Sequence, residues 1–303
     1  MSPAHRIASL LPAATELVHA LGAGDELVAI SHECDYPANV AHLPRITAGV
    51  VDGGAAAADI DAAVRALAAD GRLAFLLDPG IVAIAPTVML TQTLCELCAV
   101  SEGDVRAIAS LVSPPPQVVP MTGTTLDGIW SDFVRVGDAI GRRNEATALV
   151  ASIAQRLLAV HTALKTARAP RPRVAVIEWL DPLFAAGHWT PELVRRAGGI
   201  DVLAAPGAHS VQVDIEHVRH AVPQLLLFAP CGFDVARAER DARTLLGEPA
   251  WAWARELEAW CVDGNALTSR PGPRLADAVE VMAAISAPSV FTAPSHAYAR
   301  RVA

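Results

Sequence analysis

The chain has 303 residues, of which 52% are hydrophobic and only 18% charged. This composition is typical of a folded globular protein and is long enough for two hydrophobic cores. The net charge of −8 and the lack of a basic stripe argue against a nucleic-acid partner. No run of about 18 apolar residues escapes interruption by Asp, Pro or Gly, so no membrane span is expected.

The N-terminal segment combines a short strand, at residues 6–10, with an amphipathic helix that starts at a proline and a second strand at 27–31. It lacks the cluster of positive charge, the uninterrupted apolar stretch and the small-residue cleavage site of a signal peptide. As written, the sequence therefore predicts a cytoplasmic protein. A periplasmic protein would be expected if a leader had been removed.

This opening unit is repeated later in the chain. RIASL and ELVHALGAGDELVAI have counterparts in RVAVI and ELVRRAGGIDVLA, within 173–204. Further on, Asp78 opens a segment that leads through Pro86 and the strand VMLT, and Asp214 opens one that leads through Pro223 and LLLF. Two copies of one α/β unit predict two similar lobes that face each other across a ligand cleft.

The segment from Thr124 to Thr166 carries apolar residues at helical spacing. Because a helix of roughly 20 residues spans about 30 Å, this segment is expected to join the lobes as a stiff strut. The predicted division is an N-terminal α/β lobe at 1–122, a bridging helical segment at 123–168 and a C-terminal α/β lobe at 169–303. Since both walls of the cleft come from one chain, a monomer is expected.

Short apolar strands alternate with helices, a pattern that favours parallel sheets. Ligands of such sheets bind outside the carboxyl ends of the strands, so the residues that follow each strand are candidates. Aromatic residues form only 5% of the chain, and several of them near one site favour a flat or bulky ligand. The candidate ligand-contact residues are His32, Glu33, Tyr36, Gln92, Trp179, Phe184, His188, Trp189, Phe233 and Arg270.

Two readings of the cysteines stay open. Thiolates suit Zn²⁺ or an iron–sulfur cluster, and the candidate ligands are Cys34, Cys95, Cys98 and Cys231. A lone cysteine more often packs as a small hydrophobic residue, as expected for Cys261 within its strand.

Glu178 and Asp181 could serve acid–base chemistry. No GxSxG, HExxH, phosphate-loop or GxGxxG motif is present, so no enzymatic activity is predicted.

The LxPxxTE start, the SxxxDYP loop at 31–37, the PxFxxG-like loop at 182–187 and the SRPGPR segment are together similar to the cobalamin-binding proteins of ABC importers. These belong to a wider group that also binds siderophores and haem. The resemblance implies two Rossmann-like lobes joined by a long helix, with a corrinoid in the cleft. It implies macrocycle contacts from Tyr36, Phe184 and Trp189, and a polar contact from Arg270. A haem or siderophore carrier, or a metalloprotein with Zn or an iron–sulfur cluster, is the alternative.

Three features depart from the family pattern. The family docks on its membrane permease through one acidic residue on each lobe, and these positions correspond here to Glu216 and Pro79, so the first contact is lost. Cysteines occupy loops where importer members generally have none. No export signal is evident. Capture of a small metal chelate is therefore better supported than permease docking.

Overall fold

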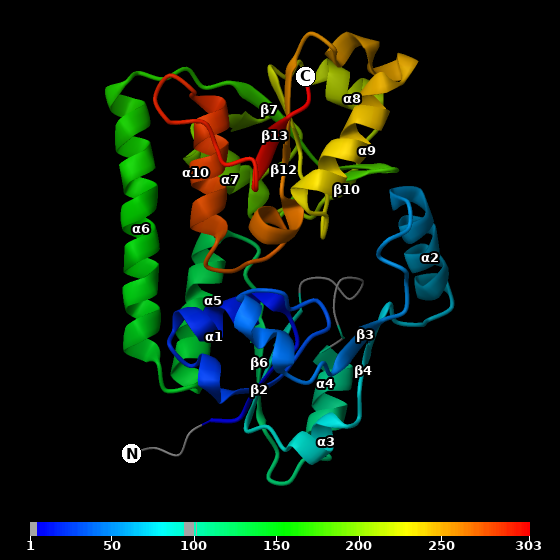
Figure 1. Ribbon diagram of the computed structural model, residues 1–303, viewed down its shortest axis with the longest axis vertical. Helices are drawn as coiled ribbons and strands as arrows, with labels where there is room; N and C mark the ends of the chain where they lie inside the picture. Colours follow the sequence, from blue (N-terminus) through cyan, green and yellow to red (C-terminus); the bar gives the residue numbers. More distant parts are fainter. Residues whose placement is uncertain (1–4, 94–99, 101) are drawn as a thin grey trace. The chain divides into compact units, whose positions relative to one another are not determined.

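The computed structural model describes residues 5–93, 100 and 102–303. The chain forms two compact units (Figure 1). The N-terminal unit comprises Met1–Gly123 and Asp127–Ser152, and the C-terminal unit comprises Thr124–Leu126 and Ile153–Ala303. The helical segment at 123–168 is thus shared between the two units.

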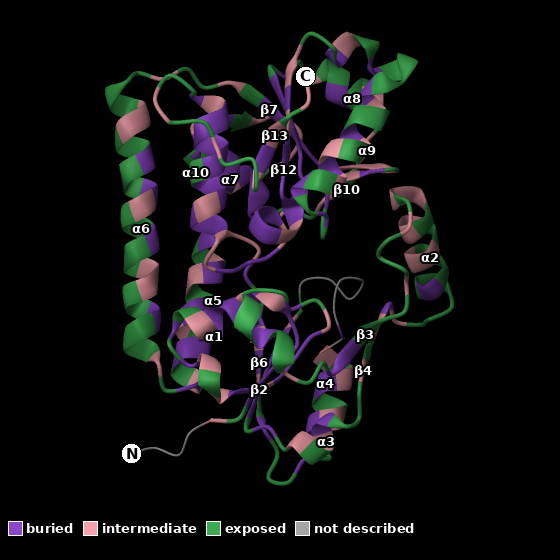
Figure 2. Cartoon of the chain, viewed as in Figure 1, coloured by how far each residue is buried: buried purple, intermediate pink, exposed green. Residues whose placement is uncertain are grey.

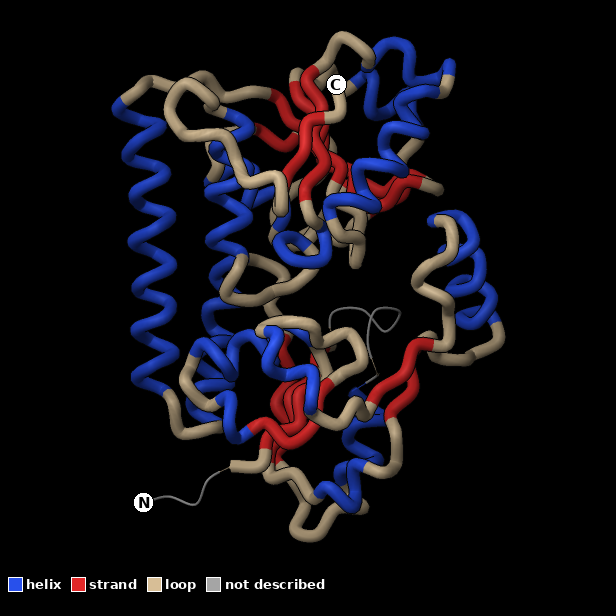
Figure 3. The backbone as a smooth tube through the Cα atoms, viewed as in Figure 1, coloured by secondary structure: helices blue, strands red, loops and turns tan. Residues whose placement is uncertain are grey.

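The N-terminal unit is built on a four-stranded parallel sheet of order β2-β1-β5-β6. Its elements are β1 (Ile7–Ser9), α1 (Pro12–Ala20), β2 (Leu27–Ile30), β3 (Thr47–Gly49), α2 (Ala57–Ala69), β4 (Phe75–Leu77), α3 (Ile81–Ile84), β5 (Val88–Gln92), α4 (Glu102–Ala109) and β6 (Gln117–Met121). All three residues of β1 are buried because this strand lies inside the sheet. β3 and β4 form a separate antiparallel ribbon, seen as a red pair in Figure 3.

The C-terminal unit has a parallel core of order β9-β7-β11-β12, extended by antiparallel strands. Its elements are β7 (Arg173–Leu180), β8 (Leu183–Ala185), α7 (Thr190–Arg196), β9 (Ile200–Asp201), β10 (Val211–Gln212), α8 (Ile215–His220), β11 (Leu225–Phe228), α9 (Val235–Gly247), β12 (Glu258–Val262), α10 (Leu275–Ser286) and β13 (Ala299–Arg301). β8 folds back on β7 as a hairpin, and β10 pairs with β8. Helices α7 and α10 lie side by side.

The sequence repeat is also a structural repeat. The orders β2-β1-β5-β6 and β9-β7-β11-β12 place equivalent elements at equivalent positions, which confirms the predicted pair of α/β lobes with parallel sheets. Arg6 Nη2, just before β1, donates to the carbonyl of Ile84 at the end of α3, at 2.6 Å. Arg173 Nη2, at the start of β7, donates to the carbonyl of Ala221 after α8, also at 2.6 Å. In both units, an arginine at the start of the strand is thus hydrogen-bonded to a carbonyl at or just after the end of the helix.

The bridging segment contains two helices, and the longer of them is the long helix that the sequence predicted. Helix α5 (Leu126–Ala139) ends before Gly141, and α6 (Arg143–Thr166) follows as a straight run of 24 residues. Gly141 has a φ of +66°, a left-handed conformation that breaks a helix and that glycine adopts without strain. The apolar spacing continued across the break because both helices bury a face.

Helix α6 combines its length with an apolar composition. In the described part of the chain it is the helix that is long and apolar enough, by length and composition, to cross a membrane. One such helix is weak evidence for a span. Arg156, in its middle, forms ion pairs with Asp277 and with Glu280 of α10, at 2.5 and 2.7 Å, so α6 is bound to the C-terminal unit.

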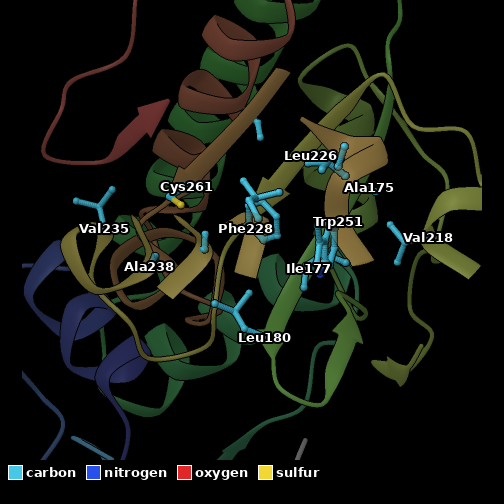
Figure 4. Packing of buried hydrophobic residues seen from close by; sticks show 14 residues of the cluster. Ala175, Ile177, Leu180, Val218, Leu226, Phe228, Val235, Ala238, Trp251 and Cys261 are labelled. Atoms are coloured by element: carbon cyan, nitrogen blue, oxygen red, sulfur yellow. The ribbon is translucent and has the colours of Figure 1, made fainter. Parts of the chain in front are cut away.

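One hydrophobic cluster of the C-terminal unit packs the sheet against α9. The strands of this unit are mostly buried (Figure 2). Figure 4 shows Cys261 among the apolar side chains of this cluster, with Val235 and Ala238 of α9. Burial raises the pKa of the Cys261 thiol to about 12, so it stays protonated. The interpretation of Cys261 as a packed core residue is confirmed.

Candidate functional site

In the N-terminal unit, the side chain of Arg45 holds the turn after β2 in place. Arg45 Nη1 donates to three carbonyls of this turn, at Ser31 (3.2 Å), His32 (2.7 Å) and Cys34 (3.1 Å). One guanidinium group therefore fixes the conformation of the turn that presents Glu33 and Tyr36, both of which are exposed. A fixed turn loses little entropy when it contacts a ligand.

His32 is half-buried against the β3–β4 ribbon. Its Nδ1 lies 2.6 Å from Thr47 Oγ1, and its ring centre is 5.5 Å from that of Phe75. A Cβ atom at Gly49 would lie 3.2 Å from His32 Nε2, so the small residue there leaves room for the ring. Burial, and then the charge of Arg45, lower the pKa of His32, which keeps its imidazole neutral near pH 7.

Gln92 ends β5 and is half-buried, at the carboxyl edge of the same sheet. Cys34 is completely buried, and its Sγ lies 3.1 Å from Thr15 Oγ1, so it packs beneath the turn. Its placement favours an anchoring role over ligation of a surface metal.

In the C-terminal unit, three of the predicted aromatic residues meet. Trp179 of β7 pairs across the hairpin with Phe184 of β8. The Trp179 and Phe233 rings pack edge to face with centres 5.3 Å apart. The guanidinium carbon of Arg237 stands 3.5 Å from the centre of the Phe233 ring. This aromatic cluster, Trp179, Phe184, Phe233 and Arg237, forms at the carboxyl end of the parallel strands.

A π-helical turn, Gly264–Thr268, follows β12 and lies next to that cluster. The Asn265 amide donates to the Phe233 carbonyl at 3.0 Å. Arg270 Nη2 donates to Asn265 Oδ1 at 2.7 Å, and Arg270 is almost fully buried. The carboxylate of Asp263 accepts from the amides of Ala266 and Val235, and so joins this turn to the start of α9.

His188 and Trp189 lie between β8 and α7. Trp189 is 7% exposed, and its indole Nε1 donates to the Thr268 carbonyl at 2.8 Å, so it supports the π-helical turn more than it covers a surface. His188 has a φ of +52° and is clamped by backbone bonds to Gly207 and Ala208. Burial, and then the charge of His209, lower the pKa of His188. Its Nε2 is buried without a partner among the described residues.

The segment that clamps His188 begins at Asp201. Asp201 Oδ1 accepts from the amides of Leu203 and Ala204 at 2.9 and 3.0 Å, and its Oδ2 is buried without a partner in the described ranges. Burial raises the pKa of this carboxyl from 3.8 to about 6. The burial penalty is absent below about pH 4, where the carboxyl is protonated in both states, and is complete above pH 6.

We expect Asp201→Asn to stabilise the protein at pH 7.5 by about 1–3 kcal/mol, since each tenfold change in an ionisation constant is about 1.4 kcal/mol. Asparagine keeps the oxygen that accepts both amide bonds. The gain should vanish at pH 4. Urea denaturation at the two pH values measures this, with Asp214→Asn at the exposed N-cap of α8 as the control. An equal effect of Asp201→Asn at both pH values would contradict the burial argument.

No group of three His, Cys, Asp or Glu side chains that could hold a metal occurs among the residues that the structure describes. Cys231 is exposed, whereas Cys34 is buried. Cys95 and Cys98, the other two predicted thiol ligands, lie outside the described residues. Zn or iron–sulfur binding therefore has no support from the described part of the chain.

The two predicted docking positions occupy equivalent turns of the repeat. Glu216 lies in the first turn of α8, is exposed, and pairs with Arg219 at 2.7 Å. Pro79 is exposed in the turn just before α3. Of the two predicted docking positions, only that of Glu216 carries an acidic side chain.

Sequence reasoning missed Arg237 and Arg45. Arg237 follows Phe233 by four residues across the start of α9, where Asp234 caps the helix by accepting from the Arg237 amide. An aromatic residue four positions before an arginine at a helix start could have indicated the contact. Arg45 acts on the turn from 11 residues or more away, and no local spacing marks it.

The repeated α/β units, with polar and aromatic side chains at the carboxyl edges of their sheets, define a two-unit ligand-binding protein. The model of the periplasmic binding protein family matches residues 7–254, and the chain belongs to this family.

Named relatives and solved structures are similar to this chain over most of its length. The vitamin B12-binding protein of Vibrio cholerae is 25% identical over 286 residues, which cover 92% of this chain and 87% of that protein. The crystal structure of periplasmic vitamin B12 binding protein BtuF of Vibrio cholerae matches with a TM-score of 0.61 at 23% identity, over 93% of this chain and 96% of that one. A periplasmic heme binding protein from Pseudomonas aeruginosa matches with a TM-score of 0.72 at 19% identity, over 97% and 96%. These two structures share the fold.

Proposed function

We propose that this protein binds a cobalamin-like corrinoid without transforming it. The observation that carries the proposal is the aromatic cluster of the C-terminal unit, where Trp179 and Phe233 pack edge to face beside Arg237. Aromatic faces cover apolar parts of a large ring, and the neighbouring Arg270–Asn265 pair offers polar contacts to amide side chains of a corrin. The similarity to a vitamin B12-binding protein over 92% of this chain supports the same class of ligand.

The histidines suit a metal chelate. The pKa values of His32 and His188 are both lowered by burial, so their imidazoles are neutral near pH 7. Neutral imidazole is the form that coordinates a transition metal. His188 Nε2, which lacks a partner in the described part of the chain, is the better candidate to approach the cobalt.

The family points to transport. We propose that the protein acts in the periplasm, the second of the two locations that the sequence left open, and delivers its ligand to an importer. The exposed Glu216 supports docking to a permease on one unit, and Pro79 offers no equivalent charge on the other.

A titration with aquocobalamin tests the proposal. We expect a saturable change of the cobalamin spectrum near one equivalent. In Trp179→Ala the dissociation constant should rise about tenfold or more, because the corrin ring loses an aromatic contact of about 1.5 kcal/mol. Trp253→Phe, a substitution in the core of the same unit, should bind as the wild type does. The affinity of Tyr36→Ala for aquocobalamin measures how much the N-terminal unit contributes to binding.

Binding of haemin without any binding of aquocobalamin would contradict the proposal that the ligand is a corrinoid. The protein would then be a carrier of another metal–tetrapyrrole. The absence of binding to both would contradict the proposed class of ligand. Equal affinity of Trp179→Ala and Trp253→Phe would remove the aromatic cluster from the site.

A further inference from the structure

The C-terminal unit contains a pocket away from all the candidate ligand-contact residues. Its volume is about 580 Å³, within the range of small-molecule sites. The last turns of α6, the segment that follows it and the end of α7 form its walls. The lining residues are His161, Leu164, Lys165, Arg168, Ala169, Pro170, Arg171, Arg195, Arg196 and Gly198.

The pocket is strongly basic in an acidic protein. Five of its lining residues are Lys or Arg and none is Asp or Glu, whereas the whole chain has a net charge of −8. Arg195 pairs with Glu192 at 3.3 Å, and Arg171 Nη2 donates to the Gly199 carbonyl at 3.2 Å. The charged groups of Lys165, Arg168 and Arg196 have no hydrogen-bond or ion-pair partner among the described residues. These three exposed cations are available to an anion.

Cations at the C-terminus of a helix often serve the helix itself, by bonding its last carbonyls. Here backbone amides already occupy those carbonyls. At the end of α6, the carbonyls of 163, 164 and 165 accept from the amides of 167, 169 and 168 at 3.0–3.1 Å. At the end of α7, the carbonyls of 193, 194 and 195 accept from the amides of 197, 199 and 198 at 2.9–3.2 Å. The side-chain cations are therefore not needed as caps.

The two helix ends differ in the residue that takes the left-handed conformation after the helix. The left-handed position after α7 is Gly198, with a φ of +90°, and the equivalent position after α6 is Arg168, with a φ of +49°. Glycine is usual at such a position because it has no Cβ atom. Gly198 also packs closely on Leu164, since a Cβ atom there would lie 2.9 Å from its methyl group. The fold thus brings the two helix ends together and places an arginine where glycine would be the easier residue.

From this cavity and its charges we propose a second ligand site, which binds a small anion with several phosphate groups. Arginine guanidinium groups form paired hydrogen bonds with phosphate oxygens, and one lysine adds a compact charge. A concave pocket between two helix ends selects a compact soluble anion over a flat membrane surface. The proposal is independent of the corrinoid site.

Lys165 provides a built-in reporter because it is the only lysine in the chain. Inorganic tripolyphosphate is the probe. Calorimetry on the full chain should show saturable binding that weakens as ionic strength rises. Tripolyphosphate should also slow the reaction of the Lys165 amine with acetic anhydride at least about fivefold, as measured by mass spectrometry, while the N-terminal amine reacts at an unchanged rate.

Two variants test the site. Arg168→Gly should weaken tripolyphosphate binding about tenfold or more without lowering the melting temperature, because glycine suits the left-handed position. Arg196→Gln should weaken it similarly. Arg72→Gln, an exposed arginine of the N-terminal unit, should leave binding unchanged. Wild-type affinity in both pocket variants, no protection of Lys165, or binding to anionic vesicles but not to tripolyphosphate would overturn the proposal.

Discussion

Replacing Gly264 with alanine is expected to destabilise the protein by about 2–4 kcal/mol and to disturb the carboxyl edge of the C-terminal sheet. A Cβ atom at this position would lie 2.0 Å from the carbonyl oxygen of Pro230 and 2.8 Å from its carbonyl carbon. Both are backbone atoms, so no side-chain rotation relieves the overlap. The loops after β11 and β12 would have to separate.

The same substitution should reach the candidate site. The loop after β11 carries Phe233, and the turn that begins at Gly264 carries Asn265, whose amide donates to the Phe233 carbonyl. Gly264→Ala should therefore weaken aquocobalamin binding even at temperatures where the protein is folded. Urea denaturation followed by circular dichroism gives the stability, and the cobalamin titration gives the affinity.

Gly247→Ala is the matched control for Gly264→Ala. Gly247 is the last residue of α9, and a Cβ atom there meets nothing within 4 Å. Alanine is expected to be neutral or to stabilise by about 0.5 kcal/mol, because it restricts the unfolded chain. If both variants unfold at the same urea concentration, the close approach of Gly264 to Pro230 does not constrain the loops after β11 and β12.

Trp251→Ala is expected to cost about 3–5 kcal/mol, the largest single effect in the core of the C-terminal unit. Trp251 is 2% exposed and packs edge to face on Phe228, with ring centres 6.0 Å apart. Its removal leaves a cavity between the sheet and α9 that its neighbours fill only in part. Thermal and urea unfolding both measure the loss.

Trp253 gives the contrast for Trp251. It stacks on Trp251 with ring centres 5.9 Å apart, but its indole Nε1 is buried without a partner in the described residues. Trp253→Phe keeps a ring and removes that polar atom, so the expected change is within about 1 kcal/mol of zero. A loss as large as that of Trp251→Ala would mean that the indole nitrogen is satisfied in solution.

The repeat in the sequence carried most of the fold prediction. The Arg-start strands at 6–10 and 173–177 predicted equivalent strands, and the structure shows both in the same place of the same sheet order. The helical segment at 124–166 was also predicted, and α6 is its long helix, but apolar periodicity does not locate the three-residue turn between α5 and α6. The left-handed Gly141 that makes this turn is a local signal that the periodicity outweighed.

The candidate site was predicted less well. Trp179 lies near the end of a predicted strand, and Phe184 and Phe233 come after predicted strands, so the sequence indicated that they lie at one sheet edge. Whether a residue at that edge faces outward was not predictable: Trp189 is buried and bonded to Thr268, and Cys34 is buried under its turn. Side-chain direction in a loop depends on the neighbours that the fold brings to it.

By itself, the sequence determined the duplicated α/β architecture and the loops that carry the polar and aromatic residues, because strand and helix periodicity and turn residues act locally. Only the tertiary structure decided which of those residues are buried anchors. It also decided that Arg45 holds the turn after β2 and that Arg237 covers Phe233. It alone assembled the basic pocket from the ends of α6 and α7, because residues 165 and 196 meet only when two helices pack. Charge clusters of this kind are dispersed in the chain and gathered by the fold.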